Sequence, residues 1–173
     1  MNTDVLKNLS ITKENTNTHT PNHNYKPNFH QKYKLNEIIY TVILRGIDND
    51  NKYSLVEMIF PPDKEKEIPL HKHERENVIM YLIEGTFLIK YGDEEINGIP
   101  GMVLKFEKNI AHSYKKVGTT GGKLLMLYAP GGLENYFSDL NSSSVKGDLQ
   151  VLDDDDRVTL HLLEKNYGWT FNM

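Results

Sequence analysis

Residues 71–85 have the sequence HKHERENVIMYLIEG, and the order of polar and apolar residues in this stretch predicts two β-strands. In a strand, residues two apart point to the same face of a sheet, so His71 and His73 direct both imidazoles to one side. The apolar run from Val78 to Ile83 has the length of a strand that other parts of the protein cover. The stretch therefore predicts a sheet interior that two histidines face.

Short apolar runs continue on both sides of this stretch, each interrupted by Gly, Pro, Asn or Asp within about 8 to 12 residues, which is typical of an all-β sandwich or barrel. Leu88 shares its face with the polar residues of the run 86–90, so we expect both faces of the sheet to be covered. Turns are expected at 91–93 and at 97–98, where Gly and Asn tolerate positive φ. The predicted strands are Glu37–Leu44, Tyr53–Phe60, Ile68–His73, Val78–Ile83, Thr86–Tyr91, Glu94–Ile96, Met102–Phe106, His112–Val117 and Lys123–Tyr128.

The spacing of apolar residues becomes helical after the glycine pair at 131–132. A second helix is expected from the acidic run 153–156 to Gly168, because acidic residues complement the positive end of a helix and these lack the spacing of a calcium-binding loop. An alternation of apolar residues within 158–162 also fits a strand. The first helix is predicted from Leu133, Tyr136, Phe137 and Leu140, which recur at helical spacing.

These patterns divide the chain into three regions. Residues 1–33 are rich in Asn, Thr, His, Lys and Pro, so we expect a flexible polar arm. Residues 34–130 are predicted to form the β-barrel, and residues 131–173 a C-terminal helical extension packed on it. Two alternatives remain for the arm: packing on a neighbouring subunit, or a second metal site built from His19, His23 and His30.

The composition narrows the classes of function. The 173 residues carry a formal net charge of -4, which argues against nucleic-acid binding, a function that requires a basic surface. The sequence contains no cysteine, so histidines and carboxylates are the only strong metal ligands that it offers. The N-terminal residues contain no apolar segment suited to a signal peptide or a membrane span, so we expect a cytoplasmic protein without membrane contact.

A third histidine, His112, begins a predicted strand 39 residues after His73. Together with His71 and His73 it would complete a face of three imidazoles, which is a ligand set for a divalent metal ion. A core histidine without a ligand is the alternative for His112. His161 lies among leucines, and we interpret it as a structural residue.

The segments around these histidines resemble the two signature motifs of the cupin superfamily. The first motif has the form G-x5-H-x-H-x(3-4)-E-x6-G and the second G-x5-P-x-G-x2-H-x3-N. The resemblance covers roughly residues 35–130, and the segment 128–134, YAPGGLE, is similar to the end of small quercetin-dioxygenase-like cupins. The matching positions are His71, His73 and Gly85 in the first motif and Gly101 and His112 in the second.

The chain departs from the first motif at Val78, which stands where the family has its metal-binding Glu. Glu76 is a candidate substitute base, because on the same strand face it would lie about 6 to 7 Å away, too far for the same ligand position but near enough to support a ligand. A solvated strand entry is the alternative for the charged string 74–76. Four other departures are expected at loop and edge positions, with a positive φ for the Asn: Glu65, Glu107, Asn109 and Lys116.

The resemblance implies a jelly-roll β-barrel whose three histidines hold Fe(II), or alternatively Mn, Ni or Zn. It implies an oxygen-dependent dioxygenase, similar to quercetinase, acting on a small aromatic or enolisable molecule. A metal-assisted isomerase, cyclase or lyase and a non-catalytic small-molecule-binding cupin are the alternatives, the last because of Val78. By analogy with many cupins we expect a homodimer. The expected substrate pocket, whose residues also fit a solid core, is formed by Val78, Met80, Leu82, Tyr114, Met126 and Tyr128.

Overall fold

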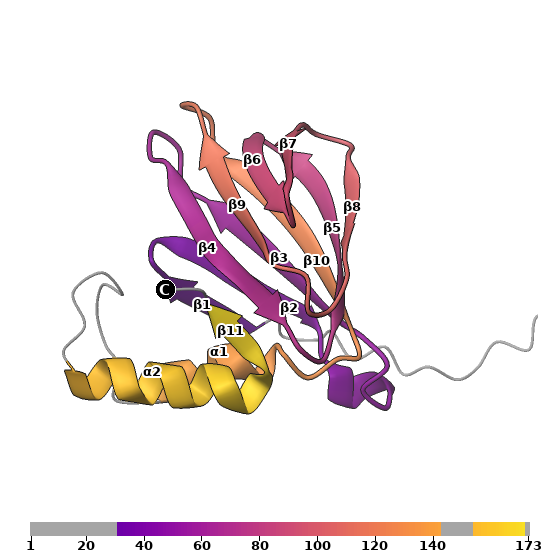
Figure 1. The fold of residues 1–173 in the computed structure, drawn as a ribbon, viewed down its shortest axis with the longest axis vertical. Coiled ribbons are helices and arrows are strands. Elements are labelled where there is room, and N and C mark those ends of the chain that lie inside the picture. Colours follow the sequence, from indigo (N-terminus) through magenta and orange to yellow (C-terminus); the bar gives the residue numbers. More distant parts are fainter. Residues whose placement is uncertain (1–30, 143–153, 172–173) are drawn as a thin grey trace, which may run out of the picture.

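The computed structural model describes residues 31–142 and 154–171, which form two antiparallel β-sheets packed face to face (Figure 1). The strand order is β1-β2-β3-β10-β5-β8 in the six-stranded sheet and β11-β4-β9-β6-β7 in the five-stranded sheet. The strands are β1 Gln31–Leu35, β2 Ile38–Leu44, β3 Ser54–Phe60, β4 Lys66–His73, β5 Asn77–Glu84, β6 Thr86–Tyr91, β7 Glu94–Gly98, β8 Val103–Phe106, β9 His112–Val117, β10 Gly122–Ala129 and β11 Trp169–Phe171. The helices are the 3-10 helix η1 Gly46–Asn49, α1 Asn135–Ser142 and α2 Asp154–Tyr167.

Alternation along the strands places the core between the two sheets. In β5, Val78, Met80 and Leu82 are buried, whereas the residues between them face outward. The aromatic residues expected between the sheets are there: Phe60 and Phe87 meet edge to face with ring centroids 5.0 Å apart. Burying each such side chain stabilises the fold by about 1.5 to 3 kcal/mol. The predicted all-β jelly roll is confirmed.

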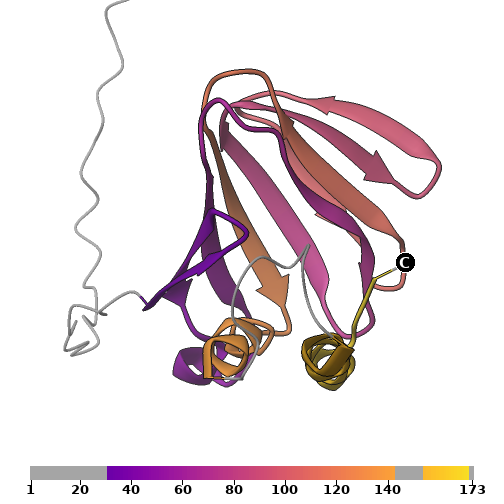
Figure 2. The same ribbon diagram turned by 90° about the vertical axis from the view of Figure 1, so that its left-hand side faces the viewer.

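The jelly roll is an open one. Within the described residues the hydrogen-bonded strand pairs lie inside one sheet or the other, so no closed barrel forms. Both helices lie at the same end of the sandwich (Figure 2). The apolar face of α1 packs inward, with Phe137 4.5 Å from the ring of Tyr40. The predicted helices are thus confirmed, and α2 begins within the acidic run, at Asp154.

A buried carboxylate ties the start of the helical extension to the sandwich. Glu134 is 3% exposed and accepts hydrogen bonds from the backbone N–H of Gly46 at 2.6 Å and of Gly132 at 2.7 Å. Hydrogen bonds to a charged acceptor are the stronger kind, so this carboxylate fixes where the chain leaves β10.

Several local expectations differ from the structure. Residues 31–33, assigned to the arm, belong to β1, and the remainder of the arm, with its three histidines, lies outside the described residues. The turn expected at 97–98 comes later, because Gly98 is the last residue of β7 and the positive φ is at Gly101. Both faces of the sheet were expected to be covered at residues 86–90. This prediction is wrong for β6, where Leu88 is 48% exposed.

Of the four other positions that depart from the cupin motifs, three lie outside the strands and one lies inside a strand. Glu65 and Glu107 lie outside the strands, and Asn109 has the expected positive φ of 66°. Lys116 instead lies inside β9, fully buried, so its expected loop or edge position is wrong. Its ammonium donates to the carbonyls of Gly118 and Thr120, which satisfies the buried charge at the turn before β10.

Candidate metal centre

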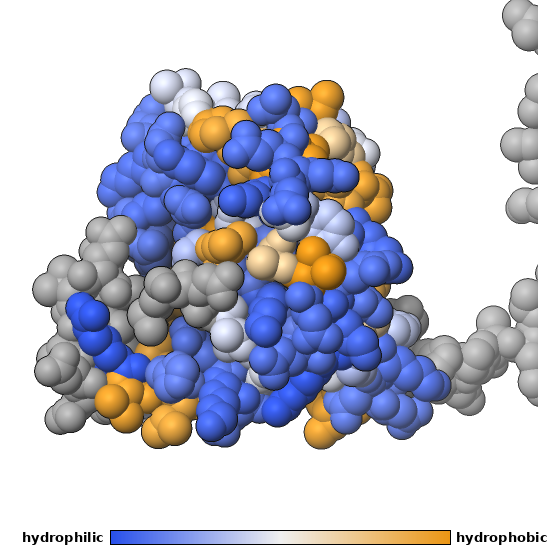
Figure 3. Space-filling model, viewed as in Figure 1, coloured by the Kyte–Doolittle hydropathy of each residue, from blue (hydrophilic) through white to orange (hydrophobic). Residues whose placement is uncertain are grey.

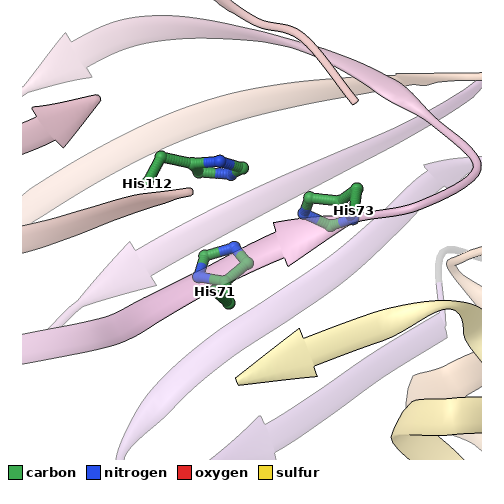
Figure 4. A group of neighbouring side chains, drawn as sticks. All are labelled: His71, His73 and His112. Carbon is green, nitrogen blue, oxygen red and sulfur yellow. The ribbon is translucent and has the colours of Figure 1, made fainter. Parts of the chain in front are cut away.

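The three histidines predicted as ligands come together between the sheets. His71 and His73 lie on β4 and His112 on the neighbouring strand β9, directly opposite His71. One nitrogen of each ring lies within 4.8 Å of those of the other two, and the rings converge in Figure 4. All three side chains are buried, with exposures of 1%, 3% and 1%. This is the arrangement that a three-coordinate protein site requires.

A register shift in β4 makes this geometry possible. Ile68 and His71 both face the interior although they are three residues apart, because the pairing with β9 slips between them. A bulge of this kind changes which face the following residues occupy. Without the slip, the alternation that buries Ile68 would turn His71 and His73 outward.

Backbone carbonyls select the tautomer of two rings. Nδ1 of His71 lies 2.7 Å from the carbonyl oxygen of Pro69, and Nδ1 of His112 lies 3.0 Å from that of Ile110. A carbonyl oxygen only accepts, so each Nδ1 carries the hydrogen and each Nε2 keeps its lone pair. This is the usual way in which a protein orients histidines for a metal.

Burial keeps these two rings neutral. It lowers the pKa of His71 well below 6.5, helped by the neighbouring imidazoles of His112 and His73. Burial also lowers the pKa of His112 to about 4. Near neutral pH protons therefore compete little for the nitrogens that would bind a cation.

A carboxylate stands beside the cluster. Glu76 is 4% exposed, and its Oε2 lies 3.5 Å from Nδ1 of His73. The solvated position considered for the string 74–76 is thus wrong for its last residue. Glu76 is not a member of the group whose ligand atoms lie within 4.8 Å of one another, so its carboxylate lies beside the histidine cluster rather than within it.

The polar atoms of the site fit a divalent cation. Within the described residues, Nδ1 of His73, Oε2 of Glu76 and Nε2 of His112 are buried without a hydrogen-bond partner. A buried carboxylate without a compensating charge costs several kcal/mol. A cation held by three imidazole nitrogens would supply that charge, and imidazole suits Fe, Ni, Cu and Zn.

Two aromatic rings fix the cluster from outside. The ring of Phe106 lies parallel to that of His112, with the ring centroids 4.4 Å apart and an interplanar angle of 1°. Trp169, from β11, stacks on His73 at 5.6 Å and 20°, and meets His71 at 5.4 Å and 67°. β11 pairs with β4 so that Trp169 lies opposite His73. Trp169 was not predicted as part of the site; its W-T-F segment after Gly168 favours a strand but does not indicate which strand it pairs with.

The comparisons with known proteins address the family. The family model described as "Cupin domain" matches residues 56–128, a segment that contains all three histidines. This segment is a cupin domain. The resemblance to the cupin superfamily that the motifs predicted is confirmed for these residues, and no curated protein matches the sequence.

Solved cupin-like structures share the fold at low sequence identity. An RmlC-like cupin from Shewanella frigidimarina has 17% identity and a TM-score of 0.53, over 66% of this chain and 96% of its own. A predicted oxalate decarboxylase from Thermotoga maritima has 20% identity and a TM-score of 0.52, over 58% and 91%. KdgF from a Halomonas species has 17% identity and a TM-score of 0.51, over 61% of this chain and 90% of its own. These likenesses concern the fold alone.

In this cupin, the residues predicted for the substrate pocket are all buried between the sheets, but at different distances from the histidines. The rings of Tyr114 and Tyr128 lie 6.2 Å from His71 and 5.8 Å from His73, respectively. Burial raises the pKa of both tyrosines well above 10, so they remain hydrogen-bond donors. The others belong to the apolar core of β5 and β10: Val78, Met80, Leu82 and Met126. Their role in substrate binding stays a prediction.

Two further observations complete the description of the site. His161 lies on α2 with an exposed side chain and is not a member of the histidine cluster.

Among the described residues, no helix is long and apolar enough to cross a membrane.

Proposed function

We propose that this cupin is a metal-dependent dioxygenase that acts on a small aromatic or enolisable molecule. The observation that carries the proposal is the cluster of three buried histidines whose ligand nitrogens lie within 4.8 Å of one another. Fe(II) is the proposed metal, with Mn, Ni or Zn as alternatives. When bound, Fe(II) would supply Lewis acidity, open coordination positions and the redox chemistry that oxygen requires.

The residues of the site have distinct roles in this proposal. His71 and His112 present Nε2 because their Nδ1 hydrogens are engaged by backbone carbonyls. Glu76 orients His73 and is the base that accepts the proton of the enolisable substrate at Oε2, which has no hydrogen-bond partner. Trp169 and Phe106 hold the rings in place and exclude water from the side of the cluster that they cover.

Val78 favours a second candidate function. It is 1% exposed, so the position of the family's carboxylate ligand is filled by an apolar side chain. A site with three neutral ligands also suits a metal-assisted isomerase or cyclase, or a cupin that binds a small molecule without converting it. Oxygen consumption separates these functions from a dioxygenase.

The test uses apoprotein loaded with Fe(II) under anaerobic conditions and then supplied with oxygen and either quercetin or acetylacetone. A dioxygenase consumes one oxygen molecule for each substrate molecule converted, and both metal-free protein and a His112→Ala variant are inactive. Conversion of substrate without oxygen uptake supports the isomerase or cyclase. Retention of full activity by His112→Ala would refute the proposed site.

We also propose a homodimer, supported by the apolar outer face of the six-stranded sheet. Ile79, Tyr81 and Val103 are 40%, 42% and 62% exposed there. Apolar side chains gather along the edge where β5 and β8 lie, whereas the face over β4, β9 and β6 is mostly hydrophilic (Figure 3). We expect Tyr81→Lys to yield a monomer by light scattering, whereas Leu88→Lys on the other sheet leaves the dimer intact. A monomeric parent protein would refute this proposal.

A further inference from the structure

A cavity of about 720 Å³ lies on the open side of the sandwich. Its walls come from the edge strand β1 and its neighbour β2 in one sheet, the edge strand β11 and its neighbour β4 in the other, and the helices α1 and α2. The two α-helices lie side by side at one end of the sandwich in Figure 2. The volume lies in the range of sites that hold a small organic molecule. None of the six residues predicted for the substrate pocket lines this cavity.

One residue belongs both to this cavity and to the histidine cluster. Trp169 lines the cavity, and the same indole stacks on His73 and meets His71 at its edge. The ring of Tyr136, also in the cavity wall, lies 4.9 Å from Trp169. A molecule in the cavity would therefore lie against the ring that covers the proposed metal site.

We propose that this cavity is the chamber that receives the body of the substrate, and that it takes an uncharged, mainly apolar ring compound that carries a hydroxyl or carbonyl group. Trp169 is the residue through which an occupant and the histidine cluster meet. The inference rests on the proposed function, because it takes the histidine site to be the place where the bound molecule reacts.

The walls of the cavity set the shape and polarity of its occupant. Tyr40, Tyr136 and Trp169 provide aromatic surface, and α2 adds Leu160, which is half-buried. Aromatic walls favour flat rings, which stack or meet them edge to face. The apolar lining thus explains why a ring compound is favoured over a small polar acid.

The charges around the cavity balance one another. Two carboxylates, Glu67 and Glu74, face two cations, Arg157 and Lys165. His161 and Glu164 also line the cavity, and burial raises the pKa of Glu164 to about 7, so near neutral pH this carboxyl both donates and accepts hydrogen bonds. A charged ligand of either sign would be repelled by wall residues of the same sign. A hydroxyl or carbonyl group can form hydrogen bonds with the wall without that cost.

The experiment uses the fact that Trp169 is the only tryptophan in the chain. Its indole N–H gives a single side-chain signal in a ¹⁵N-correlated NMR spectrum of the full-length protein. The probes are 4-hydroxybiphenyl, which is uncharged, and biphenyl-4-carboxylate, which is an anion of similar shape. We expect 4-hydroxybiphenyl to shift the indole signal with a Kd of about 1 mM or below, and the anion to bind at least about tenfold more weakly. No shift at saturating probe would overturn the chamber, and tighter binding of the anion would overturn the ligand class.

Two leucines of α2 provide a matched pair of variants. Leu160→Arg places a charge in the cavity, whereas Leu162→Arg places it on the helix surface, where Leu162 is 54% exposed. Leu160→Arg should weaken the binding of 4-hydroxybiphenyl at least about tenfold, whereas Leu162→Arg should weaken it less than about twofold. If Leu160→Arg does not fold, Leu160→Phe tests the same point by filling the cavity. Equal effects of the two substitutions on binding would refute the assignment.

Cobalt(II) in the same sample separates this inference from the proposed function. A paramagnetic ion held by the histidines should broaden the indole signal, because His71 and His73 contact Trp169. Broadening without a response to 4-hydroxybiphenyl would refute the chamber alone. A response to 4-hydroxybiphenyl without broadening would refute the metal site and leave the chamber as a binding site.

Discussion

Glu76→Gln is the substitution that best tests how the histidine site is supported. The two side chains have the same shape, so the change removes the negative charge and keeps the packing. Oε2 of Glu76 lies 3.5 Å from Nδ1 of His73 at ion-pair distance, and neither atom has a hydrogen-bond partner. The change therefore isolates what the carboxylate contributes to His73 as a ligand.

The expected magnitude follows from the kind of contact. Removing the negative charge beside an imidazole that binds a metal weakens metal binding by about tenfold, the lower end of the effect of such supporting groups, which corresponds to about 1.4 kcal/mol. Removing the partner altogether, as in Glu76→Ala, should approach the upper end of the 10- to 100-fold range typical of groups that support a metal ligand. We expect the two variants to bind Co(II) about tenfold and up to about 100-fold more weakly than the parent protein.

The assay is a competition titration of apoprotein with Co(II) and a chelating dye. Glu84→Gln is the matched control, because Glu84 is exposed at the end of β5 and is not a member of the histidine cluster. Its affinity should equal that of the parent protein. If Glu76→Gln also binds Co(II) as tightly as the parent, the carboxylate does not support His73 and the role assigned to it is refuted.

Three further substitutions test other parts of the structure. Glu134→Gln should lower the free energy of unfolding by about 2 to 3 kcal/mol in a denaturant titration, because an amide cannot accept from both Gly46 and Gly132, and an unchanged midpoint would contradict this. Trp169→Phe should let a chelator remove Co(II) faster, since a smaller ring covers the histidines; an unchanged rate would show that Trp169 does not shield them. Burial raises the pKa of Glu164 from 4.5 to about 7, so the folded protein holds this proton more tightly than the unfolded chain does. The folded protein therefore loses stability as the pH rises from about 4.5 to 7. Glu164→Gln removes that loss and, after allowance for solvent screening, should melt about 2 to 4 °C higher than the parent at pH 8 and equally at pH 4; a lower melting temperature at pH 8 would refute the assignment.

The sheets and two of the three clustered histidines were predictable because both follow from local spacing. Alternation in runs such as that of β5 survives folding, since a period of two can bury only one face. The spacing of His71 and His73, with the cupin motif around them, placed two ligands on one strand. His112 was predictable from the second motif rather than from its own surroundings.

The remaining features depend on contacts between distant or irregular segments. A bend separates β4 from β5, so alternation does not carry across it and the inward direction of Glu76 had no periodic signal. β11 is three residues long and pairs with a strand about 100 residues earlier, so nothing near Trp169 indicates its contact with His73. Lys116 is buried at a position where composition favours exposure, because carbonyls of the following turn satisfy its charge.

Metal content tests most directly whether three histidines from two strands hold one divalent cation. Untagged protein reconstituted with Fe(II) or Co(II), desalted and analysed for metal should contain about one equivalent per chain. His71→Ala and His112→Ala should each lose most of it, whereas His161→Ala, which changes a histidine outside the cluster, should retain it. Less than about a tenth of an equivalent in the parent protein, or equal retention in all three variants, would contradict the account.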